Sequence, residues 1–314
     1  MNLHHFSATV PPEIGRALAR FEEEFTYPLG PHARFRISHG EAYLPFFQAM
    51  GELDLCVLEE QGQIVGGLAR VARHLSLNGA ARLPAHYLSD LKLRSISRGS
   101  FALPRLIRET KRIIEASDYH RCYCVVMEGT GKLPTDYTGR LGVPAFHRLG
   151  DISVLRLEAG DTPHPSSIPV SGAVFEEVFH SLPRAGYSAL GADRSLRSLI
   201  EPIFLVSNNG DACAILEDTR RGKRLVLDSG PEMISGHLSR LAFASPGAAR
   251  RLLLDATAVA RDSGLPALFT AIPASRSAAV IAGLHGIQFT TAPAAIYGHA
   301  LESGHDWWID TAEI

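Results

Sequence analysis

The same order of predicted elements occurs twice along this chain, and that repetition constrains its fold more than any other feature. A helix, a hairpin, a further strand, a long helix and a closing strand are predicted in residues 12–159 and again in residues 173–302. Tyr87–Leu93 aligns with His237–Phe243 at a separation of 150 residues, and the ends of the following helices align at 146. We therefore predict a duplication followed by divergence, in a chain whose 314 residues suit two domains.

The predicted boundaries follow from composition. Residues 161–172 carry three prolines among glycine, serine and aspartate and are expected to form a linker between a domain at 1–160 and a domain at 173–314. Amphipathic spacing predicts long helices over 103–117 and 248–264, and tight turns at Gln61-Gly62 and Asn209-Gly210 predict hairpins. The tryptophans of the closing WWID segment are expected to pack across the domain junction.

Composition excludes several classes of protein. The net charge of −2 offers no basic field for nucleic acid, and no apolar run approaches the roughly 20 residues that span a bilayer. With no signal peptide in the first residues, we expect a soluble, cytoplasmic protein. The four cysteines are expected to be reduced and mostly buried. The histidines form no HExxH-like set, so we predict no metal site from them. The basic run at 220–223 is expected to be solvated.

The segment with the clearest chemical meaning is YLSDLKLRSISRGSFALPRLI, residues 87–107. A strand enters a loop with Arg98-Gly99 at its turn, and a helix leaves it. Such a loop presents backbone N–H groups and the positive end of a helix dipole to an anion, and glycine lets phosphate oxygens approach the main chain. An ordinary strand-to-helix connection remains the alternative.

This segment resembles the pyrophosphate-loop region of the GNAT (GCN5-related N-acetyltransferase) superfamily, in which a strand runs into an Arg-Gly-x-Gly loop and a long helix. The order of elements in residues 33–158 is similar to that fold throughout, and residues 173–302 resemble it more loosely. The resemblance implies an α/β (α+β) fold of two tandem domains, each a mixed, mainly antiparallel sheet flanked by helices. It also implies acetyl-CoA, or another acyl-CoA, as cofactor.

By resemblance, the cofactor would lie along Leu91, Lys92 and Leu93 and bind the loop at Arg98, Gly99, Ser100, Phe101 and Ala102. Phe101 stands where a second loop glycine is usual, so it would either narrow the approach of the diphosphate or turn aside and pack. The second copy keeps one loop glycine, Gly247, and has lost the rest of the pattern. We therefore expect a degenerate second copy that completes the acceptor pocket or packs on the first.

Catalysis on the same resemblance would need a base for the amine and an acid for the thiolate. Asp90 is the only carboxylate on the strand and is the candidate base, with Tyr87 on the other face of that strand as a further candidate. Pairing of Asp90 with Arg94 or Lys92 is the alternative. Tyr137 is the candidate acid, although it is five rather than four residues before Gly142, and a packing role is its alternative.

Three functions are compatible with these residues. The favoured one is an N-acetyltransferase that moves an acetyl group to a primary amine of a small-molecule acceptor by direct attack in a ternary complex. The second is a non-catalytic acyl-CoA-binding or sensor protein, as the altered loop and the offset tyrosine suggest. The third is an interaction protein in which the cofactor slot is closed.

Overall fold

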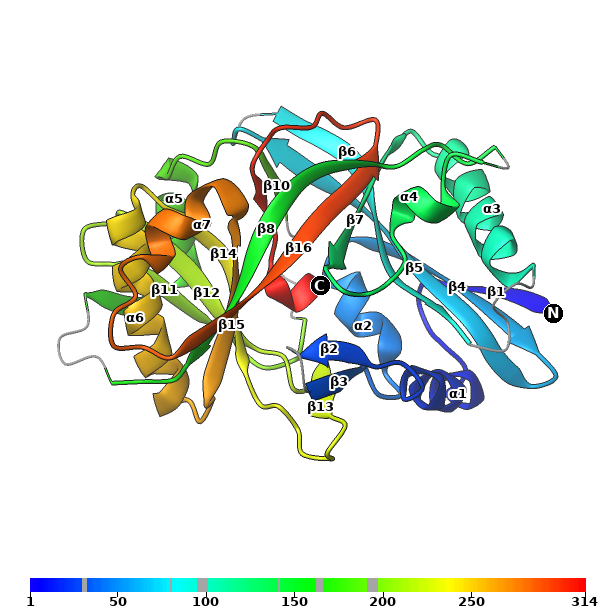
Figure 1. The fold of residues 1–314 in the computed structure, drawn as a ribbon, viewed down its shortest axis with the longest axis horizontal. Helices are drawn as coiled ribbons and strands as arrows, with labels where there is room; N and C mark the ends of the chain where they lie inside the picture. Colours follow the sequence, from blue (N-terminus) through cyan, green and yellow to red (C-terminus); the bar gives the residue numbers. More distant parts are fainter. Residues whose placement is uncertain (30–32, 80, 95–100, 141, 162–165, 191–196) are drawn as a thin grey trace.

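A computed structural model describes residues 1–29, 33–79, 81–94, 101–140, 142–161, 166–190 and 197–314 (Figure 1). The first half of the chain forms β1 (Asn2–Phe6), α1 (Pro12–Glu22), β2 (Tyr27–Leu29), β3 (Ala33–Ser38), α2 (Tyr43–Gln48), β4 (Glu52–Glu60), β5 (Gln63–Leu77), β6 (Ala81–Leu93), α3 (Ala102–Glu115), β7 (Arg121–Met127), α4 (Pro134–Tyr137) and β8 (His147–Glu158).

The second half forms β9 (Ser167–Val170), α5 (Gly172–Ser181), β10 (Tyr187–Leu190), β11 (Ile203–Ser207), β12 (Ala212–Asp218), β13 (Arg224–Leu227), β14 (Gly236–Phe243), α6 (Pro246–Asp262), β15 (Ala267–Pro273), α7 (Ala274–Ile281), β16 (Phe289–His299), β17 (Trp307–Trp308) and the 3₁₀ helix η2 (Thr311–Glu313). The predicted long helices and hairpins are confirmed. Strands β1, β2, β3, β9, β10 and β17 were not predicted from the sequence.

The described strands form one sheet of 14 strands and a separate sheet of three, β13-β3-β2. The large sheet runs β1-β4-β5-β6-β7-β16-β8-β15-β14-β12-β11-β9, and nearly all of its neighbours are antiparallel. The predicted fold class, an α/β protein with mixed, mainly antiparallel sheets flanked by helices, is therefore confirmed. The small sheet joins a strand of the second half to two strands of the first.

Each half contributes one late strand, β8 or β16, to the sheet of the other half. β8, from the first half, pairs with β15, and β16, from the second half, pairs with β7; β8 and β16 also pair with each other. Figure 1 shows these two strands crossing the middle of the molecule, between the blue and cyan elements and the yellow and orange ones. Leu155 and Leu157 of β8 accordingly lie in the hydrophobic core of the second half.

The same irregularity on β6 and β14 supports the alignment of the two halves. Asp90 has a φ of 56° and Arg240 a φ of 49°, and the register of each strand with its antiparallel neighbour shifts at that point. A bulge with one residue in the left-handed region produces this pattern, and aspartate tolerates that conformation better than most residues. The two bulges are separated by the 150 residues that align the two segments in the sequence.

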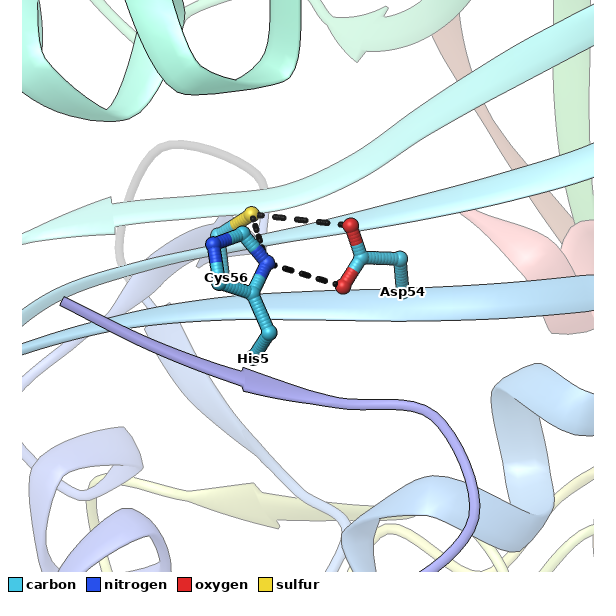
Figure 2. Close-up of side chains that lie close together, drawn as sticks. All are labelled: His5, Asp54 and Cys56. Atoms are coloured by element: carbon cyan, nitrogen blue, oxygen red, sulfur yellow. Dashed lines mark hydrogen bonds and ion pairs between the residues drawn. The ribbon is translucent and has the colours of Figure 1, made fainter. Parts of the chain in front are cut away.

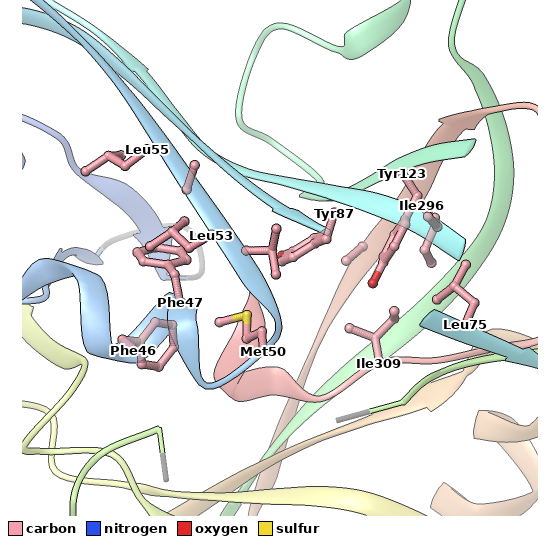
Figure 3. Close-up of a cluster of buried hydrophobic side chains, with 14 of the residues drawn as sticks. Phe46, Phe47, Met50, Leu53, Leu55, Leu75, Tyr87, Tyr123, Ile296 and Ile309 are labelled. Atoms are coloured by element: carbon pink, nitrogen blue, oxygen red, sulfur yellow. The ribbon is translucent and has the colours of Figure 1, made fainter. Parts of the chain in front are cut away.

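The closing tryptophans hold the halves together, as predicted. Trp307 is completely buried in the first core, where its ring lies 5.4 Å from that of Tyr123, centroid to centroid. Trp308 packs in the second core, 5.3 Å from Phe243. Figure 3 shows that Ile296 and Ile309, both late in the sequence, complete the first core. Burying a large aromatic side chain stabilises a fold by several kcal/mol, on the order of 3–5 by its removal.

Helices cover both faces of the first half's sheet. α1 buries Leu18 and Phe21 on one face, and α3 buries Ala102 and Leu106 on the other. The four cysteines carry free thiols and three of them are buried, as expected. Among the described helices, none has the length and apolar composition needed to cross a membrane.

Candidate functional site

The candidate site begins where the parallel strands β6 and β7 separate. The two strands pair only from Ala85 to Tyr87 and from Arg121 to Tyr123, although β6 continues to Leu93 and β7 to Met127. Beyond the pairing, the residues of both strands line one cavity. A gap between neighbouring strands exposes main-chain N–H and C=O groups that a linear, amide-containing ligand can bind.

That cavity, called the central cavity below, has a volume of about 1340 Å³. Typical pockets for small ligands are roughly 300–1,000 Å³, so the central cavity has room for more than one ligand. α3 and α4 line it on the first-half side, and the second half contributes both apolar and polar side chains, among them Lys223, Leu225, Met233, His237 and Phe269. Residues of both halves therefore surround one space.

Asp90 lies at the bulge of β6 and is engaged on both carboxylate oxygens. Tyr43 donates its hydroxyl to Oδ2, and the Lys92 ammonium lies 2.7 Å from Oδ1. The alternative in which Asp90 pairs with Lys92 is therefore the arrangement in the structure. Asp90 still lines the central cavity, with its side chain 9% exposed.

A buried chain of charges continues from this pair. Lys92 Nζ donates to Glu22 Oε1 at 2.9 Å, and the same oxygen lies 2.7 Å from Nδ1 of His39. Burial opposes ionisation of Glu22, but the charges of His39 and Lys92 outweigh it and hold the pKa of Glu22 at about 2. Glu22, His39 and Asp90 have ligand-type atoms within 4.8 Å of one another, and the Lys92 ammonium already bonds to two of the three.

Tyr87 and Tyr137 also line the central cavity. The Tyr87 hydroxyl is buried and donates to the carbonyl oxygen of Glu313 at 2.5 Å. Tyr137 is half-buried on α4. Burial is the main cause that raises the pKa of both tyrosines, so each keeps its proton at neutral pH. The cavity thus gathers all three candidate catalytic residues, from β6 and from α4.

The predicted cofactor residues are divided between β6 and the start of α3. Leu91 and Leu93 pack with Ala102 and Leu106 beneath α3, whereas the Lys92 side chain points to the opposite face and is buried in ion pairs. Arg98, Gly99 and Ser100 lie outside the described residues. Phe101 is 81% exposed, so it does not pack aside against the protein, and α3 begins directly after it.

Sequence patterns did not identify Lys223, and the prediction that the basic run 220–223 is solvated was wrong for this residue. Lys223 is buried in the central cavity and donates to the carbonyl oxygens of Ala312 and Ile314. Burial lowers its pKa to about 8. Arg220 and Arg221 are exposed, as expected. Lys223 differs from the two arginines because the C-terminal segment, which is distant in the sequence, packs over it. The sequence of the turn alone does not show this contact.

Sequence patterns also did not identify His237, or Glu313 and the arginine that it bonds to. His237 occupies the position of Tyr87 in the second half, and its Nδ1 lies 3.1 Å from Thr311 Oγ1, so both residues contact the C-terminal segment. Burial, followed by the charge of Lys223, holds the pKa of His237 well below its usual value, which keeps the imidazole neutral. Glu313 bonds to Arg73 at 2.6 Å and fixes that segment against β5.

The equivalent gap in the second half is filled. β14 and β15 pair in parallel only at two positions, and the segment Trp308–Asp310 lies at the point where they diverge. The main-chain N–H of Arg240 donates to Asp310 Oδ1 at 2.7 Å, and the Arg240 guanidinium pairs with Glu176. The cavity that remains there has a volume of about 20 Å³. The two halves therefore differ in the space beside the bulged strand.

Solved structures share this fold. A crystal structure of Saccharomyces cerevisiae N-myristoyltransferase with bound myristoyl-CoA is 12% identical, with a TM-score of 0.65 over 94% of this chain and 82% of that one. A second structure of the same yeast enzyme with myristoyl-CoA is 10% identical, with a TM-score of 0.65 over 96% of this chain and 79% of that one. A third, which also holds inhibitors, is 10% identical, with a TM-score of 0.62 over 96% and 81%.

No protein-family model matches the chain, and no curated protein matches it. At 10–12% identity the likeness shows the fold alone, and that fold is the tandem GNAT-like one that the resemblance implied.

Proposed function

We propose that this chain is an acyl-CoA-dependent N-acyltransferase. It would bind the donor in the first domain, residues 1–160, and use residues 173–314 to complete the acceptor side of the central cavity. The observation that carries the proposal is the separation of β6 and β7, which opens into a cavity in the first half, while the equivalent gap in the second half is filled. Residues 161–172 would connect the two domains.

The donor fits this arrangement in two parts. The pantetheine arm would run between β6 and β7. The main-chain groups of Leu91 and Leu93, on the part of β6 that is not paired with β7, would hydrogen-bond to it. The diphosphate would bind at Arg98, Gly99, Ser100, Phe101 and Ala102, at the start of α3, because the positive end of a helix dipole attracts anions. This follows the order strand, loop, helix in the sequence.

The transfer itself needs few protein groups. The amine nitrogen attacks the thioester carbonyl, the C–N bond forms, the C–S bond breaks, and the proton lost by the amine is balanced by the proton that the CoA thiolate gains. Asp90 would receive the amine proton and Tyr137 would supply one to the thiolate, with Tyr87 shaping the cavity wall. A thiolate with a pKa near 8.5 also leaves without an acid.

The acyl group is the least constrained part. Acetyl-CoA is the donor expected from the sequence, but the volume and apolar lining of the central cavity favour an acyl chain longer than acetyl. The solved structures of the same fold hold myristoyl-CoA, which agrees with that choice. The acceptor would be a primary amine, of a small molecule or of a peptide, that enters from the side of Lys223 and Met233.

The test is a transfer assay with acetyl-, octanoyl- and myristoyl-CoA against a panel of polyamines and peptides with free N-termini. Free CoA thiol and the mass of the amide product would be measured together. We expect amide formation, faster with the longer donors, and at least a tenfold loss in Asp90→Asn but not in the exposed control Asp151→Asn. If no donor is consumed with any amine, the proposed reaction is wrong.

The engagement of Asp90 by Lys92 and Tyr43 favours a second candidate, a non-catalytic acyl-CoA-binding or sensor protein. A carboxylate with both oxygens engaged is less free to take a proton from an amine. This candidate predicts saturable acyl-CoA binding without turnover in the same panel. It is refuted by any donor-dependent amide product that disappears in Asp90→Asn.

A further inference from the structure

Three potential metal ligands face one another on the first half's sheet, away from the central cavity. His5 comes from the edge strand β1, and Asp54 and Cys56 come from β4 (Figure 2). His5 and Cys56 are directly opposite in the antiparallel pair, and Asp54 is two residues before Cys56 and so points to the same face. Cross-strand pairing therefore gathers a nitrogen, an oxygen and a sulfur ligand.

We propose that His5, Asp54 and Cys56 form a binding site for one divalent cation of the zinc class, with the fourth position left for water. Nδ1 of His5 lies 3.6 Å from the Cys56 sulfur and 3.1 Å from Asp54 Oδ1. Zinc bonds of ~2.1 Å to nitrogen or oxygen and ~2.3 Å to sulfur give tetrahedral edges of about 3.6 Å and 3.4 Å for these pairs. The sulfur lies 4.0 Å from the other Asp54 oxygen, Oδ2, so a rotation of the carboxylate would bring a single oxygen within reach of an ion bound to both other ligands.

Glu109 of α3 supplies an outer partner for the histidine. Its Oε1 lies 3.3 Å from Nε2 of His5. A proton on Nε2 directed at this carboxylate leaves the lone pair of Nδ1 facing the Cys56 sulfur and Asp54. Metal-binding histidines typically donate their other ring N–H to a carboxylate in this way. In that tautomer and without a bound cation, the Nδ1 lone pair would face the negative Asp54 carboxylate, which is unfavourable.

Charge and access also fit a bound dication. A thiolate at Cys56 and the carboxylate of Asp54 would balance its two charges, and Arg70, 3.7 Å from Asp54 Oδ2, holds that carboxylate in place. The Cys56 sulfur is fully buried, but the His5 side chain is 36% exposed at the edge of the sheet and provides a route for the ion. N, O and S ligands together favour zinc over magnesium or calcium.

The ligands are 49 and 51 residues apart in the sequence, so no spacing motif could show them. A bound ion would fasten the N-terminal strand β1 to β4 and, through Glu109, hold α3 at the same place. The site does not depend on the proposed transferase activity, because it lies on other residues.

The test uses Co²⁺ as a spectroscopic probe on protein without a histidine tag, after treatment with a chelator. We expect one equivalent of Co²⁺ to bind, with a near-ultraviolet thiolate-to-cobalt band and visible bands of a tetrahedral site, and Zn²⁺ to displace it. His5→Gln and Cys56→Ser should each weaken binding at least a hundredfold, and Glu109→Gln should weaken it by about 10–100-fold.

Matched controls are His4→Gln, on the same strand, and Cys213→Ser, the other fully buried thiol, which should bind like the wild type. Far-ultraviolet circular dichroism would verify that each variant is folded. A spectrum without the thiolate band, or a band that persists in Cys56→Ser, overturns the proposal. A protonated His5 bridging Asp54 and Glu109, visible as a histidine cation by NMR with no cobalt bound, would overturn it as well.

Discussion

Replacing Glu22 by glutamine is expected to destabilise the fold by about 3 kcal/mol at pH 7. The carboxylate is 1% exposed, and its bonds to Lys92 and His39 hold its pKa at about 2 rather than 4.5. A fall of that size corresponds to about 3 kcal/mol of folding free energy. Removing one member of a buried ion pair typically costs a similar amount, roughly 3–5 kcal/mol, because the remaining charge stays buried.

The dependence on pH provides a second signature of the same interaction. Because the folded pKa of Glu22 is depressed, its contribution is complete above about pH 4.5 and is lost as the pH falls from there towards 2. The stability difference between the wild type and Glu22→Gln should therefore shrink across that interval. The Glu22→Gln variant has no carboxylate to protonate at this position, so its stability should not fall for this reason as the pH decreases.

Urea unfolding followed by circular dichroism would measure both effects, with the exposed neighbour Glu23→Gln as control. The double variant with Lys92→Met should be less unstable than the sum of the single variants, since the two residues act as a pair. A Glu22→Gln variant within 1 kcal/mol of the wild type, with a difference that does not vary with pH, would show that the Glu22 carboxylate is not stabilised by Lys92 and His39.

Three further predictions concern the junction and the cavity. Trp307→Ala should cost about 3–5 kcal/mol in urea unfolding, whereas Phe101→Ala, 81% exposed, should stay within about 0.5; equal effects would contradict the packing described. Gly298→Ala places a Cβ 2.4 Å from a backbone oxygen of β7 and should lower the free energy of unfolding by about 1–3 kcal/mol. In the control Gly67→Ala the new Cβ has no atom nearer than 3.8 Å and should be tolerated. A Gly298→Ala variant as stable as the wild type would argue against the pairing of β16 with β7. Burial lowers the pKa of Lys223 to about 8, so between about pH 8 and 10.5 the folded chain has lost this proton while the unfolded chain keeps it, and the stability of the fold should rise with pH. Lys223→Met should abolish that rise; a variant whose pH profile matches the wild type would place the lysine in solvent.

The sequence predicted the long helices and the two hairpins, because periodicity and turns are local signals, but it missed short strands such as β1, β9 and β17. The 150-residue alignment of Tyr87–Leu93 with His237–Phe243 predicted that the two strands are equivalent, and the structure agrees by placing a bulge in each, at Asp90 and at Arg240, which the sequence did not predict. Two aromatic residues in succession predicted that the tail is buried. The exchange of β8 and β16 could not be predicted in this way, because the same strand sequence can pair with either half.

The candidate site was only partly predictable for a related reason. Asp90 and Tyr87 were found from a strand pattern, but the partners that engage them, Tyr43 and Glu313, come from segments with no sequence link to β6. Lys223 belongs to a charged turn, and such turns are solvated unless another segment covers them. The His5 and Cys56 pair is visible only once β1 is aligned with β4.

We propose that an acyl-CoA binds in the first half of the chain and not in the second. Isothermal titration of acetyl- and myristoyl-CoA into wild type, Gly99→Glu and Gly247→Glu distinguishes the two halves, since each glycine follows the bulged strand of its half in the sequence, Gly247 in the first turn of α6, and glutamate adds a bulky negative charge to each. We expect one site per chain, weakened at least tenfold, about 1.4 kcal/mol, by Gly99→Glu and unchanged by Gly247→Glu. No binding to the wild type, or a loss confined to Gly247→Glu, would contradict it.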